Sequence, residues 1–141
     1  YGLYLKMLED ALASLSGENK PEKKTIDIKL AISAYISDDY IHEDRVRLEL
    51  YRRLSKASDI QDIYKIEEEM EDRFGKPDIF TKQFIELIII KILALNLGIQ
   101  SISSYEMNIT FTKANDTKET IKSPSKDDDD IIATTLRYLR K

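Results

Sequence analysis

The chain has 141 residues, a formal net charge of −4 at neutral pH and no cysteine. This length fits one domain with a full hydrophobic core, and the missing cysteines exclude a disulfide framework, a thiolate zinc site and thiol catalysis. The acidic balance argues against a domain that grips nucleic acid by charge alone, and no apolar run reaches the about 18 residues of a membrane-spanning helix. The chain begins at Tyr1 without a signal peptide, which indicates a piece of a larger cytoplasmic protein.

The first part of the chain is predicted to form three helices and one strand. Apolar side chains recur every three to four positions in the helical stretches and every second position in the strand. In chain order the elements are a helix over 3–15, a strand over 26–32, an irregular connection over 34–43 with Tyr35 and Tyr40 as aromatic anchors, and helices over 44–57 and 60–74. Ser58 with Gln61, or Asp59, caps the last of these helices, and Gly75 with Pro77 ends it.

The second part is predicted to contain one apolar helix and a small sheet. Residues 84–97 are apolar on nearly all sides, which is typical of a central, buried helix. The elements are this helix, which opens at Asp78 or Thr81, strands near 99–105 and over 107–112, a turn over 113–118, a weak strand over 120–122 and a helix over 131–139. This order predicts one α+β domain over 1–141, with amphipathic helices packed on a small, mostly antiparallel sheet around a long buried helix.

The helix over 60–74 carries an acidic run on one side. Its apolar positions are Ile60, Ile63, Ile66, Met70 and Phe74. Phe74 is expected to fill the core where this helix meets the long apolar one. Glu68, Glu69 and Asp72 point roughly the other way, and their like-charge pairs cost a few tenths of a kcal/mol each unless a positive group faces them. Two interpretations stay open: a solubilising face with only Lys65 as a counter-charge, or a docking face for a basic partner.

Other polar groups have simpler interpretations. His42 has no second metal ligand, and the neighbouring Asp38 and Asp39 are typical of a turn. The run over 127–130 fits carboxylates at the positive end of a helix dipole. We therefore predict no catalytic residue, no metal ligand and no cofactor site in this chain.

A basic helix supplies the alternative function. Its cations are Arg45, Arg47, Arg52, Arg53 and Lys56. Because acidic residues are interleaved with them, an exposed face laced with salt bridges is favoured. The alternative is a nucleic-acid-binding accessory module.

Three segments together resemble the C-terminal domain of the bacterial transcription-repair coupling factor. They are residues 1–11, residues 34–41 running on into 47–54, and residues 71–78 with the sequence EDRFGKPD. The long apolar helix follows the third segment, as expected for that family. The resemblance covers about residues 1–112, and the stretch over 113–126 is shorter than is usual in the family.

The resemblance implies a non-catalytic regulatory domain of an ATP-dependent, helicase-like DNA translocase that acts in transcription-coupled nucleotide excision repair. In that family the domain docks on an N-terminal module similar to the excinuclease B subunit, masks the surface for the excinuclease A subunit, and restrains the motor until RNA polymerase is engaged. The resemblance places the docking acids at Glu69 and Asp72, with Glu68 beside them. ATP and Mg²⁺ would then belong to the motor domains, and neither nucleic acid nor a membrane is expected to contact this chain directly.

Overall fold

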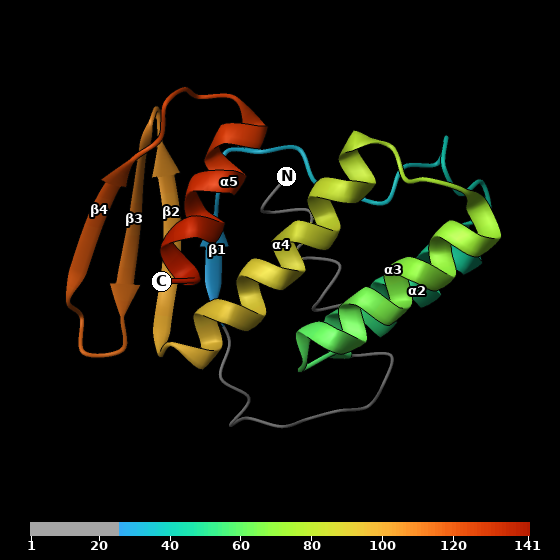
Figure 1. Ribbon diagram of the computed structural model, residues 1–141, viewed down its shortest axis with the longest axis horizontal. Helices are drawn as coiled ribbons and strands as arrows, with labels where there is room; N and C mark the ends of the chain where they lie inside the picture. The colour runs from blue at the N-terminus through green and yellow to red at the C-terminus, as the bar shows by residue number, and fades with distance from the viewer. Residues whose placement is uncertain (1–25) are drawn as a thin grey trace. The chain divides into compact units, whose positions relative to one another are not determined.

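The computed structural model describes residues 26–141, and the helix expected over 3–15 lies outside this range (Figure 1). The described elements are β1 (Asp27–Lys29), α2 (Asp44–Lys56), α3 (Ile60–Phe74), α4 (Ile79–Asn96), β2 (Ile99–Tyr105), β3 (Asn108–Lys113), β4 (Lys118–Lys122) and α5 (Asp128–Leu139). The α+β class predicted from the sequence is confirmed, and every predicted element within the described range is present. No described helix is both long enough and apolar enough to cross a membrane.

The chain divides into two compact units. A helical unit, Ser33–Ile92, contains α2, α3 and most of α4. In the described range, a sheet unit combines residues 26–32 with Leu93–Lys141, and so contains the four strands, α5 and the last turn of α4. The acidic run on α3 belongs entirely to the helical unit.

The predicted capping residues set the limits of the helices in the helical unit. The Asp59 carboxylate accepts a hydrogen bond from the Gln61 backbone N–H at 3.0 Å, and Gly75 ends α3 with φ +84°. At the start of α4, the Asp78 carboxylate accepts from the Thr81 N–H at 3.0 Å. Burial alone would raise the pKa of Asp78, but hydrogen bonds from Thr81 and Ser37 outweigh it and hold that pKa below its usual value.

The core of the helical unit follows the predicted apolar faces, with two exceptions. Ile63, Ile66 and Met70 of α3 are buried, and α4 is apolar nearly all round and largely buried. Ile60 and Phe74 are only half-buried. The prediction that Phe74 fills the core between two helices is wrong, because it lies in the last turn of α3, where the chain turns away at Gly75.

The connection before α2 is held by the aromatic anchors that the sequence predicted. Tyr35 stacks on Phe80 with ring centroids 5.0 Å apart, and the Tyr35 N–H donates to the Phe80 carbonyl at 3.2 Å. The Ser37 N–H donates to the Thr81 hydroxyl at 3.1 Å. Tyr40 reaches the end of α3, as described below. These contacts tie the irregular segment to the helices on both sides of it.

The sheet unit has strand order β1-β2-β3-β4 with one face covered by α5 (Figure 1). β2 and β3 pair antiparallel, as do β3 and β4, whereas β1 pairs parallel with β2. The mostly antiparallel prediction is confirmed. β1 is shorter than predicted, because the Ala31 N–H donates to the Ser104 hydroxyl at 2.8 Å instead of continuing the ladder. Beneath α5, Phe111 stacks on Tyr138 with ring centroids 3.9 Å apart.

Candidate functional site

The acidic side chains of α3 differ in how far local cations neutralise them. Glu67 lies on the flank of α3 nearest the buried face, where it meets the first turns of α4. Lys82 Nζ donates to Glu67 Oε2 at 2.7 Å, and the Glu67 side chain is only 14% exposed. The hydrogen bond with Glu67 raises the pKa of Lys82 against the opposing effect of burial. Glu67 is therefore a structural partner of α4 and not a free acid.

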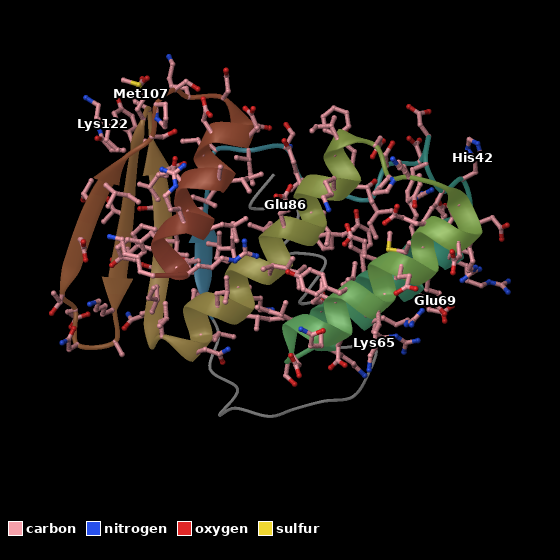
Figure 2. All side chains as sticks on the ribbon, in the orientation of Figure 1. His42, Lys65, Glu69, Glu86, Met107 and Lys122 are labelled. Atoms are coloured by element: carbon pink, nitrogen blue, oxygen red, sulfur yellow. The ribbon has the colours of Figure 1, made fainter. Side chains whose placement is uncertain are left out.

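Glu69 lies on the other flank of α3 and faces α2 (Figure 2). Arg53 Nη1 makes an ion pair with Glu69 Oε2, and the two side chains are 39% and 45% exposed. The expectation that only Lys65 offsets the acidic run is therefore wrong. Sequence spacing missed Arg53 because the partner comes from another helix, 16 residues earlier in the chain. The hydrophobic periodicity of one helix predicts which of its faces is buried, but it does not predict which residues of a second helix contact it.

Glu68 and Asp72 form the outermost part of the acidic run. Both side chains are exposed, and neither makes an ion pair or a hydrogen bond with any other residue in the described range 26–141. They are four residues apart, so they lie one helical turn from each other on the same side. Asp72 and Glu68 are thus the like-charge pair that remains uncompensated, and Glu69 stands beside them with its charge partly offset.

The position of this face depends on Tyr40, which holds the C-terminal end of α3. The Tyr40 hydroxyl donates to the Gly75 carbonyl at 2.6 Å and lies 3.3 Å from the Met70 carbonyl oxygen. Its ring meets that of Phe74 edge-on, with centroids 6.0 Å apart. Burial first, and then the charge of Glu71, raise the pKa of Tyr40 to about 12, so the hydroxyl keeps its proton.

Some cations of the basic cluster on α2 are engaged in contacts within the helical unit. Arg47 donates to two backbone carbonyls of the preceding connection at 2.6 and 3.0 Å. Arg53 is paired with Glu69. Arg45 and Arg52 remain exposed. The five predicted cations therefore do not act as one free surface for a phosphate backbone.

The other candidate residues lie where the simpler interpretations predicted. His42 is exposed at the edge of the helical unit (Figure 2). Asp38 and Asp39 form an exposed turn, in which the Asp39 N–H donates to the Ser37 hydroxyl at 3.1 Å. The run over 127–130 lies at the start of α5, as the helix-dipole interpretation predicted.

Comparisons with known proteins agree with the resemblance seen in the sequence. A family model described as the TRCF domain matches residues 30–123. The transcription-repair-coupling factor of Helicobacter pylori (strain J99) is 47% identical over 139 residues, which cover 99% of this chain and 14% of that protein. The factor of Rickettsia typhi (strain Wilmington) is 32% identical over 104 residues, which cover 72% of this chain and 9% of that protein.

A solved structure extends the likeness to three dimensions. The crystal structure of the C-terminal domain of a transcription-repair coupling factor aligns with a TM-score of 0.60 at 25% identity, and the alignment covers 63% of this chain and 55% of the other. The chain spans about a seventh of the length of its Helicobacter relative, 14%. Because the family model matches more than half of the sequence and the fold agrees, the chain belongs to the TRCF domain family.

Proposed function

We propose that this chain is the C-terminal regulatory domain of a transcription-repair coupling factor, and that it works by docking and not by catalysis. The observation that carries this proposal is the exposed pair Glu68 and Asp72, which face solvent without a counter-charge in the described range. A helix that keeps two like charges one turn apart gives up a few tenths of a kcal/mol. A basic partner surface would recover this free energy on docking.

The partner in this proposal is the N-terminal excinuclease-B-like module of the same polypeptide. Docking there masks the surface that binds the excinuclease A subunit and restrains the DNA translocase until it engages stalled RNA polymerase. ATP and Mg²⁺ act in the motor domains, outside this chain. The membership in the TRCF domain family and the position of the acids on the helix that ends in the EDRFG sequence support this assignment.

The physical form of the mechanism is an intramolecular latch. Tethering within one polypeptide supplies a high effective concentration, so each contact can be weak. A coupling of only about 2–3 kcal/mol keeps the open state a minor species. Since exposed charge pairs are screened, the latch loosens as the salt concentration rises.

Charge reversal in the full-length protein tests the proposal. The variant is Glu68→Lys with Asp72→Lys, which turns the uncompensated pair into cations without removing the ion pair between α2 and α3. Glu69→Lys is less suitable, since it would place a second cation against Arg53. We expect the double variant to bind the excinuclease A subunit more tightly and to hydrolyse ATP faster without RNA polymerase.

The matched control is Asp38→Lys with Glu49→Lys. Both residues are exposed in the same helical unit, and this variant has the same change in net charge. We expect it to behave like the wild type. If the two double variants behave alike, or if neither activity changes, the proposed docking face is wrong.

A further inference from the structure

The ion pair between Arg53 and Glu69 has a consequence for any partner that docks on α3. Both side chains are about half exposed, so the pair is open to competition from outside. The Glu67–Lys82 pair on the opposite flank differs, because the Glu67 side chain is only 14% exposed. Among the paired acids of α3, Glu69 is thus the one that a new cation can reach.

We infer that Arg53 is a resident competitor for the basic partner surface and sets the strength of docking. This inference rests on the proposed function, since it concerns the same face of α3. In the undocked protein Arg53 stabilises Glu69, and this stabilisation is lost or shared when a partner cation arrives. In the docked protein the guanidinium of Arg53 lies close to that cation and repels it. Both effects weaken docking, so removing the charge of Arg53 strengthens it.

The size of the effect follows from the exposure of the pair. An ion pair between exposed side chains contributes little, because water and salt screen it. The corresponding change in a docking equilibrium constant is about two- to fivefold. This is enough to change the population of the minor open state measurably, and the effect would fade at high salt.

The test measures docking in the full-length protein by carbodiimide labelling of the Asp72 carboxylate, followed by mass spectrometry. Labelling of the exposed Glu49 on α2 serves as the internal reference. The salt concentration is set so that the wild-type protein is half protected at Asp72. We expect Arg53→Gln to raise the docking constant about two- to fivefold, seen as slower labelling of Asp72.

Three further variants separate competition from a general charge or folding effect. Arg53→Lys keeps the charge and should stay near the wild type. Arg52→Gln removes an exposed charge from the same helix and should change docking less than Arg53→Gln does. In a Glu69→Gln background, Arg53→Gln should strengthen docking less than it does in the wild type, because the competition for Glu69 is already gone.

The outcomes distinguish this inference from the proposal on which it rests. If Glu68→Lys with Asp72→Lys opens the latch but Arg53→Gln weakens docking or leaves it unchanged, the role of Arg53 is wrong and the docking face stands. If Asp72 is labelled at the same rate at low and high salt in every variant, the docking face fails and the role of Arg53 fails with it. An equal effect of Arg53→Gln with and without Glu69 would also overturn the inference.

Discussion

The replacement Tyr40→Phe tests how α3 is held in place. It removes one oxygen atom and leaves the aromatic contact with Phe74. The lost hydroxyl donates to the Gly75 carbonyl at 2.6 Å. Since Gly75 is exposed, water can replace this donor at the Gly75 carbonyl. The change should therefore lower the free energy of unfolding by about 0.5–1.5 kcal/mol, the net contribution of one hydrogen bond.

Urea denaturation followed by far-UV circular dichroism measures this loss at neutral pH. The matched control is Tyr64→Phe, which removes a hydroxyl from the exposed face of the same helix, where Tyr64 is 40% exposed. We expect the control to change the free energy of unfolding by less than about 0.5 kcal/mol. Equal losses in the two variants would refute the role of Tyr40 as the contact that holds the end of α3.

Two further predictions concern the stability of the described fold. Phe74→Ala should lower the free energy of unfolding by about 1.5–2.5 kcal/mol, because Phe74 is only half-buried. Met70→Ala should cost more, about 2–5 kcal/mol, because Met70 is buried. Urea denaturation compares the two variants, and an equal or larger loss at Phe74 would show that Phe74 belongs to the core. Burial is the main cause that raises the pKa of both Tyr40 and Tyr138 from 10.0 to about 12. The stability that these two groups supply is complete below pH 10 and is lost as the pH rises toward 12, since the unfolded chain ionises first. Phenolate absorbance against pH checks this, and ordinary titration near pH 10 in the folded protein would contradict it.

The local features of the fold were predictable because the groups that set them are close in sequence. Asp59 and Asp78 cap helices through backbone N–H groups two and three residues away. Gly75 ends α3 with a positive φ that glycine adopts without strain. The turn around Asn115 was predictable for the same reason, since the Asn115 side chain accepts a hydrogen bond from the Thr117 N–H, two residues away, at 3.0 Å.

The parallel pairing of β1 with β2 was not predictable in the same way. The two strands are about 70 residues apart in the chain, and Asp27 pairs with Ser101 only because the intervening helical unit returns the chain to the sheet. Alternating apolar residues predicted a longer strand over 26–32. Alternation reports which side chains are buried, and Leu30 and Ile32 are indeed buried, but it does not report where the hydrogen-bonded ladder stops.

The candidate site shows the same division between local and long-range information. The 3.6-residue period of α3 is sufficient to place Glu68, Glu69 and Asp72 away from its buried side, because the period sets the direction of each side chain. The packing of α2 against α3 is what pairs Arg53 with Glu69, and it leaves Glu68 and Asp72 uncompensated in the described range. The physical reason is that an ion pair between two helices depends on their register and packing, and the spacing of residues along either helix does not contain that information.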